Sequence, residues 1–296
     1  MSILTVENLS KNYGRIQALK NVSFSVPEGT VFGILGPNGS GKTTMLGTIM
    51  DILKPTTGGY KLFDETPTAA HRRKIGTLLE TPNFYHYLSG VKNLEIAAEI
   101  KQHGKGDIDR VLETVDLTRR KDSKFSTYSL GMKQRLAIAS CLLGDPDVLV
   151  FDEPTNGLDP VGIAEIRDLM KNLYRQGKTI IMASHLLDEV EKVCTHVAIL
   201  KRGELVTSGN VNEILSNEDM VEVGAADNNK LLEILKNFGP KTRVTFDGGI
   251  IKVFLPVGTA NLTEINTYCF DNGVILNHLL LKKKSLEARF FELTNN

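Results

Sequence analysis

Residues 36–43 form a glycine-rich segment whose residue types and spacing suit phosphate binding. The segment is Gly-Pro-Asn-Gly-Ser-Gly-Lys-Thr, a full match to the pattern G-x-x-x-x-G-K-[ST]. The apolar run 31–35 precedes it and predicts a buried strand, and residues 44–50 follow with the apolar spacing of a helix. Backbone N–H groups of such a loop converge on an anion, and the helix N-terminus adds its positive dipole end. A glycine-rich turn without function is the alternative, but the combined features favour nucleoside triphosphate binding.

The loop supplies both phosphate and metal contacts. We expect Lys42 to reach the β- and γ-phosphates of the nucleotide and the Thr43 hydroxyl to ligate Mg²⁺. The residues predicted to bind the nucleotide here are Gly36, Asn38, Gly39, Ser40, Gly41, Lys42, Thr43 and Thr44.

Hydrolysis of the nucleotide needs further groups, and two later strands provide them. The apolar run 148–151 ends in Asp152 and Glu153, as in a buried parallel strand that delivers acids at its carboxyl end. We expect Asp152 to hold Mg²⁺ through water and Glu153 to act as the general base. A second run, residues 179–183, leads to His185, which could donate to the γ-phosphate. Two solvated acids and a structural histidine are the alternatives.

The composition limits the class of protein that carries these groups. The chain has 296 residues, enough for one large core or two domains, and 35 basic residues balance 35 acidic ones. A generic nucleic-acid binder would show a basic surplus, so we expect no nucleic-acid partner. Three unevenly spaced cysteines predict reduced, buried thiols in a cytosolic protein. The N-terminus shows no signal segment, and no apolar run approaches the roughly 18 residues that span a bilayer.

The segment 128–135 distinguishes between classes of phosphate-loop protein. It is Tyr-Ser-Leu-Gly-Met-Lys-Gln-Arg, and the apolar run 136–139 follows. With this segment the chain resembles the nucleotide-binding subunit of ATP-binding-cassette (ABC) transporters. The phosphate loop, this signature, the Asp-Glu strand, the segment 156–159 and the histidine after the next strand occur in the family's order, and the resemblance covers about residues 1–215.

The resemblance implies that two subunits share each nucleotide. The Ser129 side chain and the Gly131 backbone would contact the γ-phosphate held by a second subunit, at the start of a helix. The signature departs from the family's Leu-Ser-Gly-Gly-Gln, because Tyr128, Leu130 and Met132 replace the first Leu, the first Gly and the Gln. The two phosphate-contacting residues are kept, so the resemblance implies a closing dimer, of the chain with itself or with a related ATPase subunit, that binds ATP and Mg²⁺.

The resemblance also assigns three residues outside these motifs. Tyr13 would stack on adenine, and Asp159 would lie at the dimer interface; a tyrosine packed at a strand end and a helix-capping or turn aspartate before Pro160 are the alternatives. Glu80 stands where the family has Gln and would reach the Mg²⁺ and the attacking water. Together with the signature, Glu80 is similar to the bacitracin-exporter and lantibiotic-immunity branch, with neutral drift as the alternative. The aromatic segment 83–88 lies where the family docks its permease, or belongs to the core.

These patterns predict an α/β phosphate-loop NTPase of the ABC type. Its ATP-binding domain would span residues 1–216, beginning with short strands in residues 1–30 and holding a helical insert around residues 93–121 that is broken at 104–106. A small C-terminal α+β domain, residues 217–296, would follow in βαββαβ order with an antiparallel sheet and a final helix at 285–292. Three lysines at 282–284 are fewer than a lipid-binding cluster usually holds, and we expect a solvated strand end.

We therefore predict an ATPase subunit that drives a separate integral-membrane permease and lies in the cytoplasm on the inner face of the cell membrane. Peptide antibiotics of the lantibiotic or bacitracin kind are the predicted cargo. A general exporter of drugs, ions, lipids or polysaccharides, or a soluble ABC ATPase without a transport role, are the alternatives. A nucleotide sensor without turnover is disfavoured, because both Glu153 and His185 are present. The cargo, the direction of transport and the composition of the dimer do not follow from the sequence.

Overall fold

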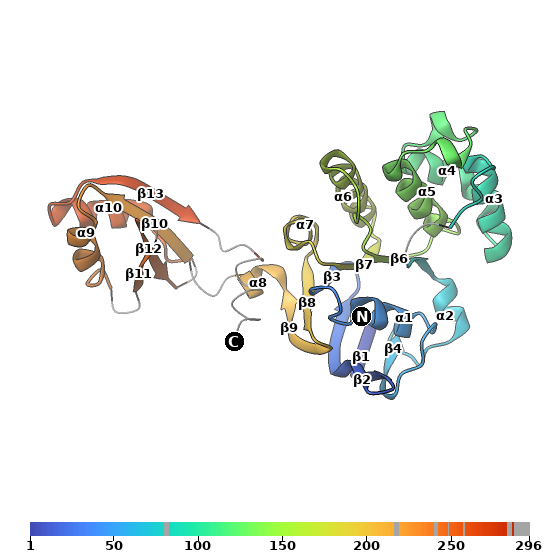
Figure 1. Cartoon of the computed structure of the whole chain (residues 1–296), viewed down its shortest axis with the longest axis horizontal. Helices are drawn as coiled ribbons and strands as arrows, with labels where there is room; N and C mark the ends of the chain where they lie inside the picture. The colour runs from blue at the N-terminus through green and yellow to red at the C-terminus, as the bar shows by residue number, and fades with distance from the viewer. Residues whose placement is uncertain are drawn as a thin grey trace. The chain divides into compact units, whose positions relative to one another are not determined.

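The computed structural model describes residues 1–79, 83–215, 219–239, 242–247, 249–256, 258–282 and 286. The chain forms two compact units, Met1–Gly209 and Asn210–Asn296, each with its own secondary structure (Figure 1). The predicted domain boundary falls seven residues later, at residues 216 and 217, outside the described residues, and stays a prediction. The predicted α/β class is confirmed.

A six-stranded sheet forms the centre of the first unit. Its strand order is β5 (Ile75–Leu78), β6 (Val148–Asp152), β7 (Thr179–Ser184), β3 (Val31–Leu35), β8 (His196–Lys201) and β9 (Glu204–Asn210). The first five strands pair in parallel along this order. Every residue of β3, β6 and β7 is buried, as the continuous apolar runs predict for strands covered on both faces.

The carboxyl ends of three of these strands lie at the same level. Leu35 of β3 is paired with Ser184 of β7, and Asp152 of β6 is paired with Ala183 of β7. The chain segments that follow β3, β6 and β7 therefore begin next to one another at one edge of the sheet.

A three-stranded antiparallel sheet opens the unit, in the order β2 (Ile16–Pro27), β1 (Ser2–Tyr13) and β4 (Thr57–Leu62). The short strands predicted for residues 1–30 are wrong in length, since β1 and β2 each span 12 residues. Irregular pairing interrupts them instead, and Asn8 and Asn21 adopt positive φ angles of 50° and 51°. Residues of this sheet share one core with Met45 and Leu46 of α1 (Lys42–Ile49).

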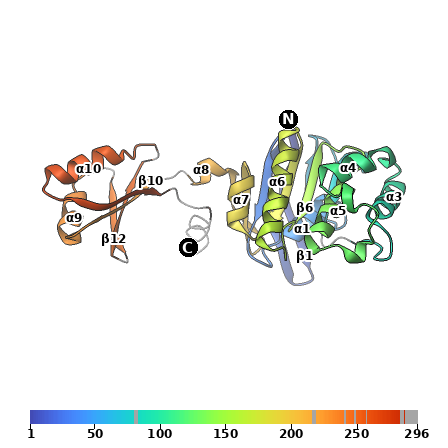
Figure 2. The same cartoon turned by 90° about the horizontal axis from the view of Figure 1, so that it is seen from above.

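The helical insert lies beside the β5 and β6 side of the six-stranded sheet in both views (Figures 1 and 2). It contains α3 (Gly90–Lys101), α4 (Ile108–Thr114) and α5 (Leu130–Leu142). The predicted break is confirmed, because α3 ends at Lys101 with Gln102 as its C-cap, and Gly104 follows with a φ of 82°. The other helices of the unit are α2 (Ala69–Arg73), α6 (Pro160–Arg175) and α7 (Leu187–Val193).

The second unit has the predicted βαββαβ order. After α8 (Val211–Leu215), it runs through β10 (Asp219–Ala225), α9 (Asn228–Leu235), β11 (Arg243–Asp247), β12 (Ile250–Leu255), α10 (Leu262–Asp271) and β13 (Leu276–Lys282). The strands form an antiparallel sheet in the order β11-β12-β10-β13. Alternate residues of β10 and β12, such as Val221 and Val253, share a core with Leu231 of α9 and Ile265 of α10. The predicted helix 285–292 lies outside the described residues except for Leu286, as do Lys283 and Lys284.

Two further expectations concern membrane segments and thiols. No helix in the described ranges is both long enough and apolar enough to span a bilayer. Cys141, Cys194 and Cys269 are free and buried, as predicted. Burial raises the pKa of the Cys141 thiol to about 12 and also raises the pKa of Cys194 and Cys269.

We expect the native protein to be inert toward thiol reagents at pH 8, because a thiol that is both buried and protonated is a poor nucleophile. The measurement is titration with Ellman's reagent, with and without denaturant. The three cysteines should react only after unfolding. Rapid reaction of any of them in the native protein would contradict the buried positions.

Candidate nucleotide-binding site

The phosphate loop joins β3 to α1 through backbone that favours glycine. Gly39 and Gly41 have φ angles of 78° and 107°, which residues with side chains rarely adopt. A Cβ on Gly41 would also lie 2.7 Å from the carbonyl oxygen of Ala18. Gly41 is the N-cap of α1 and provides no side-chain cap, so the first N–H groups of the helix are not bonded by a capping side chain. This is the backbone arrangement that binds an anion.

A cavity of about 330 Å³ lies at this loop. Its lining residues are Ala18, Asn38, Gly39, Gly41, Lys42, Thr43, Thr44 and Glu153. The structure thus brings most of the predicted loop residues together with the predicted base. Gly36 and Ser40 are not among the lining residues. The hydroxyl of Ser40 is buried and has no hydrogen-bond partner within the described ranges.

Glu153 is held between two side chains, one from the start of α1 and one from the segment that follows β7. Its Oε1 lies 3.4 Å from the Lys42 ammonium, and its Oε2 lies 2.9 Å from Nδ1 of His185. The Lys42 side chain is only 6% exposed, and its ammonium also donates to the Gly36 carbonyl at 2.8 Å. Glu153 has a φ of 48°, and its backbone N–H donates to the Ala183 carbonyl at 3.0 Å. The carboxylate is therefore fixed at the cavity, where it can accept a proton from a water molecule.

The predicted metal ligands are oxygen donors of the kind that Mg²⁺ prefers. The Thr43 hydroxyl belongs to the cavity lining, and Asp152 is buried at the end of β6. Glu80 lies outside the described residues. Across the described ranges no three His, Cys, Asp or Glu side chains cluster to hold a metal by themselves. Mg²⁺ usually needs only one or two protein ligands together with substrate phosphates, so the donors present fit this ion.

Ser129 begins the signature helix. It is the N-cap of α5, and its Oγ accepts a hydrogen bond from the Met132 N–H at 3.3 Å. The preceding Tyr128 is 4% exposed, and its hydroxyl donates to the Arg120 carbonyl at 2.8 Å. A Cβ on Gly90 would overlap that hydroxyl, so Gly90 provides the room for the larger side chain. Ser129 and Gly131 do not line the cavity of their own chain, and their contact with a second subunit's nucleotide stays a prediction.

Tyr13 and Asp159 have local partners in the structure. Tyr13 is the last residue of β1, is 45% exposed, and does not line the cavity; the Lys11 ammonium lies 5.2 Å from its ring centre. Asp159 is the N-cap of α6, and its Oδ1 accepts from the Gly162 N–H at 2.8 Å. Within one chain, Asp159 therefore caps a helix, which was the alternative prediction for this residue. Adenine stacking by Tyr13 and the interface role of Asp159 stay predictions.

The aromatic segment 83–88 contains both core and surface residues. Phe84 packs edge-on against the buried Phe125, with ring centres 5.3 Å apart. Tyr85 and Tyr87 are 51% and 69% exposed. Packing against the core thus describes Phe84, and docking of a permease at the exposed residues stays a prediction.

Two features of the site were not predicted from the sequence: Ala18 lines the cavity, and Lys42 contacts Glu153. Ala18 lies in β2, and it reaches the cavity because its carbonyl approaches Gly41. An alanine within a strand carries no motif signal. The Lys42–Glu153 contact could have been found from the two strand ends, since both residues were expected at the same edge of the sheet.

Comparisons with known proteins identify relatives of this chain. The family model described as "ABC transporter" matches residues 19–156. The bacitracin transport ATP-binding protein BcrA of Enterococcus faecalis is 35% identical, over 98% of this chain and 96% of BcrA. The lantibiotic transport ATP-binding protein SrtF of Streptococcus pyogenes is 34% identical, over 74% of this chain and 99% of SrtF. The dimeric ATP-binding cassette MJ0796, solved in a post-hydrolysis state with ADP and Pi, superposes with a TM-score of 0.62 at 28% identity, covering 70% of this chain and 98% of MJ0796.

Two substitutions of Asp159 separate its capping role from any further role. Asp159→Ala should lower the free energy of unfolding by about 1 kcal/mol, because the cap of α6 is lost. Asp159→Asn should retain the stability, because asparagine caps equally well. Urea denaturation measures both. A loss of nucleotide turnover in Asp159→Asn at unchanged stability would support the interface role, and wild-type turnover in that variant would leave only the cap.

Proposed function

The chain belongs to the family of ABC transporter ATP-binding subunits, and we propose that it hydrolyses ATP to drive a separate membrane permease that exports peptide antibiotics. The observation that carries the catalytic part is the position of Glu153. Its carboxylate lies at the nucleotide cavity, between the ammonium of Lys42 and the imidazole of His185.

The geometry suggests a division of tasks among these groups. The N–H groups of the phosphate loop and the Lys42 ammonium bind the β- and γ-phosphates. Glu153 takes a proton from the attacking water, and His185, hydrogen-bonded to Glu153, orients that carboxylate and contacts the γ-phosphate. Thr43 and Asp152 would hold Mg²⁺, and the ion would neutralise charge that develops on the phosphates.

The second half of each site would come from another subunit. Ser129 and Gly131 open α5 and lie outside the Lys42 cavity of the same chain, as a composite site requires. The dimeric state of MJ0796 supports this arrangement. We infer that the dimer, with itself or with a related subunit, docks on the cytoplasmic side of its permease, and that exposed Tyr85 and Tyr87 belong to the docking surface.

The share of this chain that is similar to each transport protein supports one class of cargo. The similarity to BcrA covers 98% of this chain and so includes the C-terminal unit, whereas that to SrtF covers 74%. Within the proposed class of peptide antibiotics, this difference favours bacitracin-like compounds over lantibiotics.

Glu153→Gln should retain ATP binding and lose turnover by about 10²–10⁴-fold, because the amide cannot accept the proton. The variant should also accumulate as a dimer with Mg-ATP in gel filtration. Phosphate release by malachite green gives the rate, and a fluorescent ATP analogue gives the affinity. Glu99→Gln is the matched control, because Glu99 is exposed, pairs with Lys105 and does not line the cavity, and it should keep wild-type turnover. Wild-type turnover in Glu153→Gln would exclude Glu153 as the base.

Glu80→Gln tests the cargo assignment, because it keeps the size of the side chain and removes its charge. If Glu80 links the Mg²⁺ region to the permease, the isolated subunit should retain much of its ATPase activity. Protection of a sensitive host by the intact transporter, measured as the minimal inhibitory concentration of bacitracin, should fall. Equal protection by both proteins would mean that Glu80 is neutral drift. Failure of the wild type to protect against any peptide antibiotic, together with export of an unrelated drug or ion, would place the protein among general exporters.

A further inference from the structure

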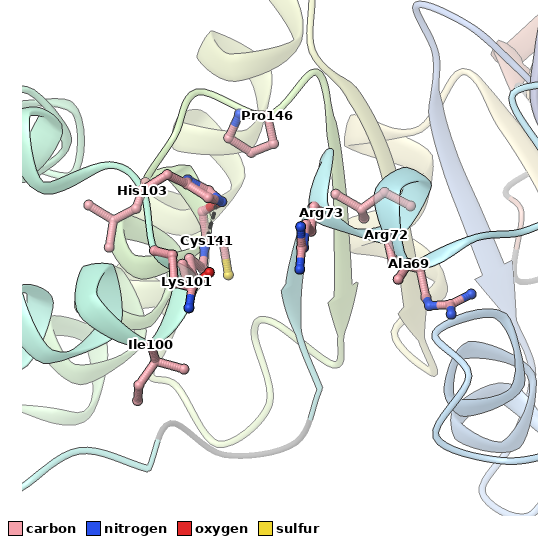
Figure 3. A pocket seen from close by; sticks show the side chains of 11 residues that line it. Ala69, Arg72, Arg73, Ile100, Lys101, His103, Cys141 and Pro146 are labelled. Atoms are coloured by element: carbon pink, nitrogen blue, oxygen red, sulfur yellow. Dashed lines mark hydrogen bonds between the residues drawn. The ribbon is translucent and has the colours of Figure 1, made fainter.

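A second cavity, of about 490 Å³, lies in the Met1–Gly209 unit between α2, the end of α3 and the end of α5 (Figure 3). Ile75, the first residue of β5, and Pro146, which precedes β6, contribute to its lining. The cavity is therefore at the amino ends of the parallel strands, whereas the nucleotide site is at their carboxyl ends. No residue lines both.

The charged side chains that line this cavity are all basic. They are Arg72, Arg73 and Lys101, and His103 stands beside them, while no aspartate or glutamate is among the lining residues. Asp147 is next to Pro146, but it is exposed and does not line the cavity. The other carboxylates nearest in sequence have partners, and Glu99 pairs with Lys105 at 2.9 Å. Asp107 accepts from the Gly144 N–H at 2.8 Å, and Asp145 pairs with Lys178 at 2.9 Å.

Arg73 is the basic side chain that faces across the cavity. It extends from α2 toward Lys101 and Cys141 on the opposite wall, whereas Arg72 extends the other way (Figure 3) and pairs with Asp51 at 3.0 Å. Within the described ranges, Arg73 has no hydrogen-bond or ion-pair partner. A guanidinium group presents several N–H groups in a fixed fork that matches phosphate and carboxylate oxygens.

Lys101 forms the opposite side and is partly used by the fold. Its ammonium donates to the carbonyls of Ser140 and Cys141, at 2.6 and 3.4 Å, near the end of α5. Burial lowers the pKa of Lys101, so its charged form lacks full compensation there. An ammonium has three N–H groups, and these two carbonyls leave one for a ligand. His103 is close by because Gly144 has no side chain; a Cβ there would overlap the imidazole.

We propose that this cavity binds a small multivalent oxyanion, a pyrophosphate or the phosphate groups of a metabolite, between Arg73 on one side and Lys101 with His103 on the other. The anion would offset the charges of two cations that face each other without an acid. The bound anion would also connect α2 to α3 and α5 of the helical insert. The proposal does not depend on the transport function, because none of these residues belongs to the nucleotide cavity.

The test uses the full chain with Lys42→Ala, so that binding at the phosphate loop is weakened. Inorganic pyrophosphate without divalent metal is titrated by isothermal calorimetry. We expect one bound equivalent, and Arg73→Gln in the same background should weaken it about tenfold or more, since a bidentate charged contact is lost. Arg73→Lys, which keeps the charge but not the fork, should bind with intermediate affinity.

Lys74→Gln is the matched control. It removes the same charge from the next residue, whose ammonium lies over the Phe63 ring at 5.7 Å and does not line the cavity. Its affinity for pyrophosphate should equal that of the Lys42→Ala parent. If Arg73→Gln and Lys74→Gln weaken pyrophosphate binding equally, the effect is general charge attraction and the proposed site is wrong. Absence of binding in the parent, with a native circular dichroism spectrum, would overturn it as well. ATP turnover by the wild type is measured separately and tests only the proposed function.

Discussion

The parallel register of β3, β6 and β7 is the constraint on which the rest of the structure depends. Because their carboxyl ends lie at one level, the phosphate loop, Glu153 and His185 begin side by side, although more than a hundred residues of sequence separate the loop from the other two. All residues of the three strands are buried, so their side chains pack against particular neighbours on both faces of the sheet. A shift of one residue would turn each buried side chain to the other face of the sheet and displace every site residue.

Burial at this edge also explains the local pairing of charges. The Lys42 ammonium is almost fully removed from water, and an unpaired buried charge is costly. The Gly36 carbonyl and the Glu153 carboxylate compensate it, and the same carboxylate is bonded to His185. Glu153 reaches this position through a φ of 48°, a conformation that is unfavourable for a residue with a side chain. Such strain at a strand end is typical of residues whose position matters for function.

The sequence predicted the local features well and the long-range ones less well. The buried strands, the break after α3 and the βαββαβ order follow from patterns that neighbouring residues set, and the structure has all of them. The lengths of β1 and β2 could not be predicted, because pairing between strands with bulges decides them. The hydrogen-bond partner of Tyr128 could not be predicted either. Its hydroxyl bonds to a carbonyl eight residues earlier, and Gly90, far along the chain, makes room for it.

The net charge of the sequence likewise does not predict where charged side chains gather in the folded protein. A chain with 35 basic and 35 acidic residues has no overall field to attract a polyanion, and this excludes only those partners that need a large basic surface. It does not determine how individual charges are grouped once the chain folds. Arg72 and Arg73 are neighbours in sequence, yet one is neutralised by Asp51 and the other faces a cavity without acids. The difference arises from the helix on which both lie, because consecutive residues of a helix point in different directions. A balanced composition is thus compatible with a locally cationic site, and only the three-dimensional arrangement reveals it.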